Sequence, residues 1–367
     1  MDTAVRLLAS DEPSIRYKVR VCALGEDPAS KAVRALREEI RKSPRVAALL
    51  AGCHRAAPYQ KWRGTHWVLA ELADLGYPPG DESLVPMRDE VLEYWLAPEF
   101  FDEFACARKS HAHSRRGVPV MAGRHRRCAS QQGNALFAIV TLGLADARVE
   151  KLVERLLHWQ WPDGGWNCDK DPNADTSSFM ETLLPMRGLV AYSRAGKAVE
   201  RAARVFLDRE LCKRRSDGAI IRREFVQLHY PLYWHYDILG GLKVMKEAGL
   251  VRDPRCAFAL DLLESKRLPD GGFPAEARHY KVSRKVELGA DAVNWGGTSK
   301  RVANPWVTAD ALGVLAAAGR RGYGLLAGAG SFAGAPGSTR SSGDSASPFA
   351  ARSCASRCCR ARLRNCA

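Results

Sequence analysis

Three short turns of similar sequence recur along the chain at nearly equal intervals, and this repeat limits the fold more than any other feature. The turns begin 54 and 53 residues apart, and their sequences are Asp163-Gly164-Gly165-Trp166, Asp217-Gly218-Ala219-Ile220 and Asp270-Gly271-Gly272-Phe273. Asp and Gly favour tight turns, because Asp bonds to nearby backbone and Gly tolerates positive φ. The chain therefore repeats a structural unit of about 50 residues, which is typical of solenoids and closed rings.

Largely apolar segments accompany these turns, and each ends on a leucine. We predict that each segment is a helix enclosed by others, because its apolar residues cover several faces. The segments are residues 64–75, 133–144, 178–189, 231–242 and 304–315. Amphipathic stretches predict outer helices with one face in water, over residues 149–157, 198–207 and 256–264. One such pair of helices cannot bury its own apolar face, so we expect successive pairs to stack.

The first turn is surrounded by tryptophans. Trp159, Trp161 and Trp166 lie on either side of Pro162-Asp163-Gly164-Gly165. The glycines permit backbone dihedral angles closed to other residues, and the indoles supply a large apolar area at a joint between helices. We therefore interpret this motif as a packing brace.

Residues 159–169 and 267–276, with the helices predicted after them, resemble the repeats of the terpenoid cyclase and protein prenyltransferase superfamily. That superfamily includes squalene cyclases and prenyltransferase β subunits. The resemblance implies an all-α fold, an α/α toroid of repeated helix pairs, in which inner helices line a cavity. We expect the toroid over residues 61–318 and, over residues 1–60, a helical segment that caps or completes the ring. Residues 319–367 predict a disordered low-complexity tail, typical of a shifted reading frame.

Charge and cysteine content exclude some classes of protein. The net charge is +15, but much of it lies in the tail and in residues 108–127, without a zinc-finger or RNA-recognition pattern. We therefore expect no nucleic acid partner. No apolar run is long enough for a transmembrane helix or a signal peptide. The eleven cysteines are scattered and odd in number, which favours reduced thiols and a cytoplasmic location.

An acid just before residues 178–189 is the first candidate for catalysis. Squalene-type cyclases protonate their substrate with an Asp-rich motif, and Asp175 is the nearest match, although its companion aspartate is missing. Asp175 alternatively belongs to a helix cap, since Ser178 and Glu181 fit a capping box. Asp169 is the second candidate, and Asp169, Asp171 and Asp175 are a set of acids for Mg²⁺, which we expect less than zinc.

Zinc is the cofactor that the resemblance implies. Prenyltransferase β subunits bind it through an Asp-x-Cys pair and a distant histidine, and His235 stands one position from where that histidine falls. The Asp-x-Cys pair is missing at the start of an inner helix here. If the loops before inner helices meet at one mouth of the ring, Cys128, Cys168 and His235 form an alternative set of zinc ligands.

Aromatic residues near the starts of inner helices predict a wall for an apolar ligand, namely Tyr233, Trp234, Tyr236 and Trp306. Aromatic rings suit isoprenoid chains and carbocations, and core packing is the alternative. We therefore expect an enzyme, a transferase or isomerase that acts on an isoprenoid or other lipid-like substrate in a central cavity. The alternative is a non-catalytic helical-repeat binding module. The basic residues 108–127 are either a solvated loop or a cover that holds a diphosphate.

Overall fold

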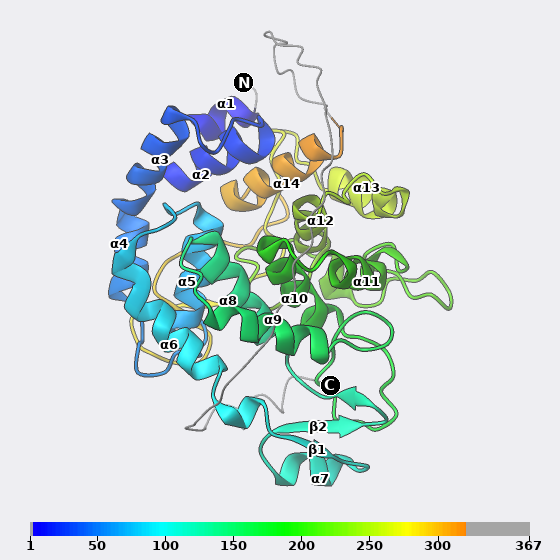
Figure 1. The fold of residues 1–367 in the computed structure, drawn as a ribbon. Helices are drawn as coiled ribbons and strands as arrows, with labels where there is room; N and C mark the ends of the chain where they lie inside the picture. The colour runs from blue at the N-terminus through cyan, green and yellow to red at the C-terminus, as the bar shows by residue number, and fades with distance from the viewer. Residues whose placement is uncertain (1–2, 321–367) are drawn as a thin grey trace, which may run out of the picture.

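The computed structural model describes residues 3–320 and is mainly α-helical, with fourteen α-helices among these residues (Figure 1). The all-α prediction misses two small sheets. The predicted tail, residues 319–367, lies outside the described residues except for Gly319 and Arg320. Within residues 3–320, no helix combines the length and the apolar content that crossing a membrane requires.

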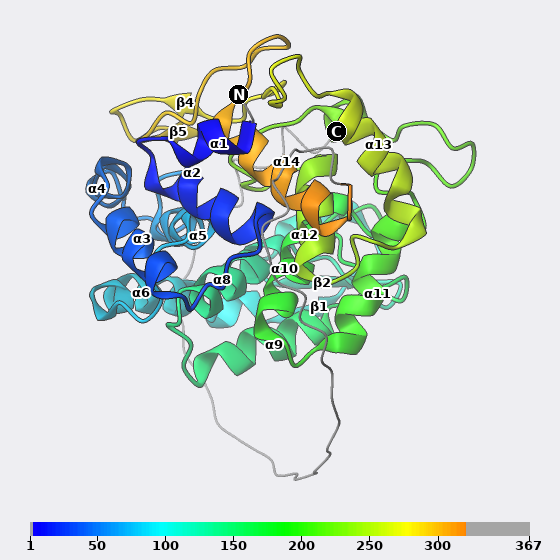
Figure 2. The same cartoon turned by 90° about the horizontal axis from the view of Figure 1, so that it is seen from above.

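Five buried helices correspond to the five predicted apolar segments. They are α5 (Thr65–Leu75), α8 (Ser130–Thr141), α10 (Phe179–Tyr192), α12 (Ile238–Glu247) and α14 (Pro305–Ala317). Each packs on the next, α5 on α8, α8 on α10, α10 on α12 and α12 on α14. In Figure 2 they follow one another in a curved row through the interior of the molecule. We call them the inner row.

The N-terminal helices connect the two ends of the inner row. α2 (Pro13–Tyr17) continues into a π-helical segment, η1 (Lys18–Ala23), which packs along α14, and α2 also contacts α5. α1 (Thr3–Leu8) packs on α14, α3 (Lys31–Arg41) on α2, and α4 (Pro44–Ala51) on α3 and α5. Residues 13–23 therefore bridge the first and last helices of the row.

Four helices of the inner row pair with the next long helix in the chain. α6 (Val85–Trp95) packs on α5, α9 (Arg148–His158) on α8, α11 (Gly196–Leu207) on α10, and α13 (Ala257–Ser265) on α12. The predicted outer helices are present as α9, α11 and α13. They turn an apolar face inward, which includes Leu152, Phe206 and Leu263. The helix pair is therefore the repeated unit of the structure.

The fourth apolar segment begins its helix later than predicted. Residues 231–237 are irregular, and Tyr233 has a φ of +40°. α12 begins at Ile238, because Asp237 Oδ1 accepts the Gly240 N–H at 2.7 Å and caps the helix. His235 therefore lies in the loop before α12 and not at the start of a helix.

α8 and α10 approach each other backbone to backbone. A Cβ added at Gly133 of α8 would lie 2.3 Å from Pro185 Cα in α10. A Cβ added at Gly188 of α10 would lie 2.3 Å from the carbonyl oxygen of Gly133. Only glycine permits this contact, so the two helices are held in one register.

The three tryptophans of the first turn are fully buried, as a packing brace requires. The Trp166 N–H donates to Thr182 Oγ1 in α10 at 3.1 Å, and the indole Nε1 of Trp166 donates to the Leu156 carbonyl in α9 at 2.9 Å. Gln160 Nε2 donates to the Ala198 carbonyl in α11 at 2.9 Å. The turn is therefore bonded to three helices at once.

The third turn repeats the bond to the helix that follows. The Phe273 N–H donates to Thr308 Oγ1 at 2.9 Å, and Thr308 is the fourth residue of α14 as Thr182 is of α10. The second turn, residues 217–220, is mostly exposed and lacks this bond, because the fourth residue of α12 is Gly241, which has no hydroxyl. Two of the three turns are therefore equivalent in structure.

Residues 103–127, which we call the insert, are folded rather than a simple loop. They contain β1 (Glu103–Ala105), α7 (Lys109–Ser114), β2 (Val118–Met121) and β3 (Arg124–His125). β2 pairs parallel with β1 and antiparallel with β3. Elsewhere, β4 (Lys281–Val282) pairs parallel with β5 (Ala290–Asp291). Short 3₁₀ helices cover Glu82–Leu84, Pro98–Phe100, Arg223–Val226 and Pro254–Cys256.

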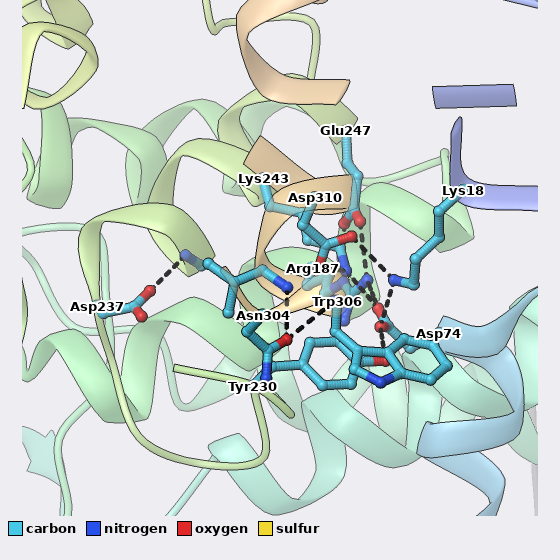
Figure 3. Close-up of polar contacts among 12 residues, drawn as sticks. Lys18, Asp74, Arg187, Tyr230, Asp237, Lys243, Glu247, Asn304, Trp306 and Asp310 are labelled. Carbon is cyan, nitrogen blue, oxygen red and sulfur yellow. Dashed lines mark hydrogen bonds and ion pairs between the residues drawn. The ribbon is translucent and has the colours of Figure 1, made fainter. Parts of the chain in front are cut away.

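A group of buried ions lies where the inner row converges, and Figure 3 shows its side chains pointing toward one another. Asp74 of α5 accepts from Lys18 Nζ at 2.8 Å, from Lys243 Nζ at 2.6 Å and from an Arg187 guanidinium nitrogen at 2.9 Å. Asp310 of α14 accepts from the same two lysines, each at 2.9 Å. This ionic cluster joins η1, α5, α10, α12 and α14.

Mutual neutralisation keeps the ionic cluster charged despite its burial. Burial disfavours the charged form of Asp74, but Lys18, Lys243 and Arg187 outweigh it and hold the pKa of Asp74 well below its usual range. A carboxyl with a lowered pKa stabilises the fold above its usual pKa. That stabilisation is lost as the pH falls through the pKa of the folded state, so we expect the ionic cluster to fail in acid.

We predict that Gly164→Ala lowers the free energy of unfolding by about 2–4 kcal/mol, because strain and a clash combine there. Gly164 has a φ of +103°, and an added Cβ would lie 2.3 Å from the Arg201 carbonyl oxygen. Gly123→Ala is the matched control, since its φ is +70° and no atom lies within 4 Å of the added Cβ. The control should cost only about 1–2 kcal/mol. Urea unfolding measures both, and equal losses would contradict the clash with Arg201.

We predict that Asp74→Asn lowers the free energy of unfolding at neutral pH by about 3–5 kcal/mol, because three buried cations lose their shared anion. Asp208→Asn is the control, since it removes an exposed aspartate that pairs with Arg255 at 3.0 Å. An exposed pair should contribute less than about 1 kcal/mol. Urea unfolding measures both variants, and similar small losses would mean that Asp74 is not central to the fold.

Candidate functional site

Cys128, Cys168 and Glu181 converge at the N-terminal ends of α8 and α10. One ligand atom of each lies within 4.8 Å of the ligand atoms of the other two. Cys128 lies two residues before α8, Cys168 follows the first turn, and Glu181 is in the first turn of α10. We call these residues the thiol site. Helix N-termini carry partial positive charge and favour anionic groups such as thiolates and carboxylates.

Local hydrogen bonds bring the two cysteines together. The Ser178 N–H donates to the Trp166 carbonyl at 2.9 Å, which fixes the loop that carries Cys168 beside α10. Arg126 and Asn167 form a parallel bridge, so the residues that follow each of them run side by side. The end of the insert therefore lies beside the start of the loop that follows the first turn.

Glu181 is buried and heavily bonded. Its Oε2 accepts the Ser130 N–H at 3.1 Å, and its Oε1 accepts Trp234 Nε1 at 3.2 Å and the Cys168 thiol at 3.6 Å. Burial raises the pKa of Glu181, and these bonds oppose the shift. One of the two hydrogen bonds of the predicted capping box is present, because Ser178 Oγ accepts the Glu181 N–H at 3.5 Å. The Glu181 carboxylate reaches across to α8 instead of back to Ser178.

The donor set of the thiol site fits zinc. Two sulfurs and a carboxylate oxygen are ligands that zinc takes in proteins, at about 2.3 Å and about 2.0–2.2 Å. Neighbouring ligand atoms of a tetrahedral site then lie about 3.5 Å apart, so small side-chain movements are sufficient. Both cysteines are partly exposed, which leaves the site accessible to a fourth ligand.

Two of the three predicted ligand residues lie together in the structure. The structure brings Cys128 and Cys168 together but puts Glu181 in the place expected for His235. The His235 ring stacks on His279, with ring centroids 3.7 Å apart. Burial lowers the pKa of His235 to about 2, and its histidine neighbours act in the same direction. Glu181 could have been found from the sequence, because it is the single acid within the largely apolar segment 178–189.

The predicted aromatic residues lie in separate places. Trp234 lies at the thiol site, and Tyr233 stacks on Trp62 with ring centroids 4.1 Å apart. Trp306 stacks on Tyr230 near the ionic cluster, as Figure 3 shows. Tyr236 packs among three buried phenylalanines and donates its hydroxyl to a backbone carbonyl. Core packing therefore accounts for Tyr236 and Trp306, and Trp234 is the one of the four that contacts the thiol site.

The predicted acids lie at the surface. Asp169 and Asp175 are exposed, and each bonds locally, Asp169 to the Asp171 N–H at 2.9 Å and Asp175 to the Thr176 hydroxyl at 3.0 Å. Within residues 3–320, neither belongs to a group of three metal-ligating side chains. The buried environment that a proton-donating acid of this kind requires is not found at either residue.

A pair of buried carboxyls was missed from the sequence. Asp291 Oδ2 accepts the Tyr233 hydroxyl and, at 2.6 Å, Trp295 Nε1. Burial raises the pKa of Glu71 well above its usual value, and Asp291 adds to the shift. Burial also raises the pKa of Asp291. A carboxyl with a raised pKa is better suited to donating a proton than an ordinary one, and Glu71 was visible in the sequence as an acid inside the apolar segment 64–75.

Comparison with known proteins adds no family assignment. No protein-family model matches the sequence, and no curated protein matches it. The likeness to terpenoid cyclases and prenyltransferases therefore depends on the repeats alone and stays a prediction.

We predict that Glu71→Gln becomes increasingly stabilising as the pH rises. Because the pKa of Glu71 is raised in the folded protein, the wild type loses stability from its usual pKa upward. The variant should gain on the wild type by up to about 1.4 kcal/mol per pH unit as the pH rises above the usual pKa of a glutamate. Urea unfolding at several pH values measures the difference. Glu39→Gln controls for the loss of one exposed carboxylate of α3, and a difference for Glu71→Gln that is independent of pH would contradict the prediction.

Proposed function

We propose that the helix pairs form an α/α toroid, with the inner row and residues 13–23 as its inner wall. The successive contacts from α5 to α14, and the return through η1 and α2, support this arrangement. The outer helices α6, α9, α11 and α13 each cover one inner helix. The equivalent bonds from Trp166 to Thr182 and from Phe273 to Thr308 also support a repeated unit.

We propose that the protein is a zinc-dependent enzyme, a transferase or isomerase that acts on an isoprenoid or other lipid-like substrate at the thiol site. The observation that carries the proposal is the convergence of Cys128, Cys168 and Glu181 at the ends of two inner helices beside Trp234. Bound zinc would supply an open coordination position that polarises an oxygen or stabilises a thiolate.

Side chains around the thiol site suit a ligand with an apolar chain and an anionic end. Trp234 offers an aromatic surface, and its indole Nε1 holds Glu181 in place. Lys61 Nζ lies 5.2 Å from the Trp234 ring and 5.0 Å from the Trp62 ring. We therefore place the apolar chain against the Trp234 ring and the anionic end, such as a diphosphate, at Lys61.

The second candidate function is a non-catalytic binding module. The ionic cluster favours it, because Lys18, Asp74 and Asp310 lie where a cyclase needs an apolar cavity. The exposed positions of Asp169 and Asp175 favour it as well. In this reading the thiol site is a structural metal site, and the protein binds its ligand without changing it.

We predict that cobalt bound to the full-length protein gives a thiolate-to-cobalt charge-transfer band, and that Cys128→Ala or Cys168→Ala abolishes it. Thiolate ligation produces this band, while nitrogen and oxygen ligands do not. Cys53→Ala is the control, because burial raises the pKa of the Cys53 thiol to about 11 and Cys53 belongs to neither metal-ligating group. A band that persists in both cysteine variants, or that never forms, would contradict the site.

The same variants separate the two functions. Zinc-loaded protein is incubated with an isoprenoid diphosphate, and the products are separated by chromatography. An enzyme should convert the substrate, and conversion should fall at least about a hundredfold in Cys168→Ala and persist in Cys53→Ala. Binding without conversion, unchanged in Cys168→Ala, would support the module and overturn the enzyme.

A further inference from the structure

We propose a second metal site, formed by Glu103, His125 and His158, which binds a divalent transition metal such as zinc and clamps the insert onto α9. Glu103 Oε2 lies 3.1 Å from His125 Nε2 and 3.1 Å from His158 Nε2. One ligand atom of each of the three residues lies within 4.8 Å of the other two. None of them takes part in the thiol site, so the inference does not depend on the proposed function.

The distances suit a tetrahedral metal. Zinc binds histidine nitrogen at about 2.0–2.1 Å and carboxylate oxygen at about 2.0–2.2 Å, so neighbouring ligand atoms lie about 3.4 Å apart. The two nitrogen-to-oxygen distances of 3.1 Å are close to this value. The two imidazole rings lie beside each other, with centroids 4.5 Å apart and planes inclined at 52°. Two histidines and a carboxylate leave a fourth position, which is open to water because His158 is about half exposed.

The three ligands come from separate elements that are held firmly. Glu103 is in β1, His125 is in β3, and His158 ends α9. Strand β2 pairs with both β1 and β3, which fixes Glu103 relative to His125. In Figure 1, β1 and β2 lie beyond the end of α9, away from the inner row. A metal bound here would therefore link the insert directly to α9. Along the chain, these two parts are connected only through α8.

Two tryptophans of the packing brace help to orient these ligands through hydrogen bonds. Trp159 Nε1 donates to Glu103 Oε1 at 3.1 Å, and Trp161 Nε1 donates to the His125 carbonyl at 2.9 Å. An indole N–H can only donate, so Glu103 Oε1 accepts from Trp159. Oε2 faces His125, while His158 Nε2 lies 3.0 Å from Oε1 and 3.1 Å from Oε2. Arg155 lies 3.9 Å from Oε1, on the same side as Trp159. Outer contacts that fix ligand orientation are a common feature of metal sites.

The alternative is a plain ion pair of Glu103 with the histidines. It explains the distances but predicts no affinity for a metal. Zinc titration separates the two readings, because only a metal site binds zinc with a dependence on both His125 and His158.

The test titrates zinc into the full-length, metal-stripped Cys128→Ala/Cys168→Ala protein by calorimetry, so that the thiol site does not contribute. We expect binding that weakens at least about tenfold in His158→Ala and in His125→Ala. His113→Ala is the matched control, because His113 is an exposed histidine of the same insert outside the group. His158 is about half exposed, so His158→Ala keeps the test valid if His125→Ala does not fold.

A second experiment tests directly whether bound zinc holds the insert against α9. Zinc should slow proteolysis of the insert in the Cys128→Ala/Cys168→Ala protein and in its His113→Ala derivative, but not in its His158→Ala derivative. Zinc binding that is absent, or that is equal in the His125→Ala, His158→Ala and His113→Ala proteins, would overturn the proposal.

Discussion

The ionic cluster is the interaction on which the rest of the structure depends. The single carboxylate of Asp74 accepts hydrogen bonds from Lys18, Lys243 and Arg187, which come from three segments far apart in the sequence. Each ion would be costly if buried alone, so no helix of the cluster reaches its buried position unless the others are in place. The ionic cluster also places charged side chains where the helices of the inner row meet. The enzyme that we propose would therefore bind its apolar ligand at the helix N-termini, where the thiol site lies, and not at the ionic cluster.

Much of the fold could be predicted because its signals are local. The Asp-Gly turns and the apolar segments predict α5, α8, α10 and α14 from neighbouring residues alone. The start of α12 could not be predicted in this way, because residues 231–237 are rich in aromatics that suit a buried helix equally well. Their irregular backbone depends on distant partners, such as Asp291, which bonds the Tyr233 hydroxyl. The prediction that the second turn resembles the other two was wrong for a related reason. Its sequence repeats the Asp-Gly pattern, but α12 has no hydroxyl at the position where Thr182 and Thr308 accept a hydrogen bond.

The candidate site could be predicted only in part, because its ligands come from separate segments. The closeness of Cys128 and Cys168 could be predicted from one expectation, namely that the loops before inner helices meet. The buried charges were the overlooked signal. Glu71, Asp74 and Glu181 stand in segments that are largely apolar, and a buried ion needs either a partner or a proton. The sequence therefore indicates that such partners exist, but their identity depends on contacts such as Glu181 with Ser130, which only the folded chain defines.

The three tryptophans of the first turn have a role beyond packing. Trp166 fixes the loop that presents Cys168, while Trp159 bonds the Glu103 carboxylate and Trp161 bonds the His125 backbone. The insert begins at Glu103 and ends just before Cys128, so its two ends lie at the two groups of metal-ligating side chains. One turn thus contacts both the insert and the loop that carries Cys168. The packing brace therefore links the insert to the thiol site through hydrogen bonds of its tryptophans.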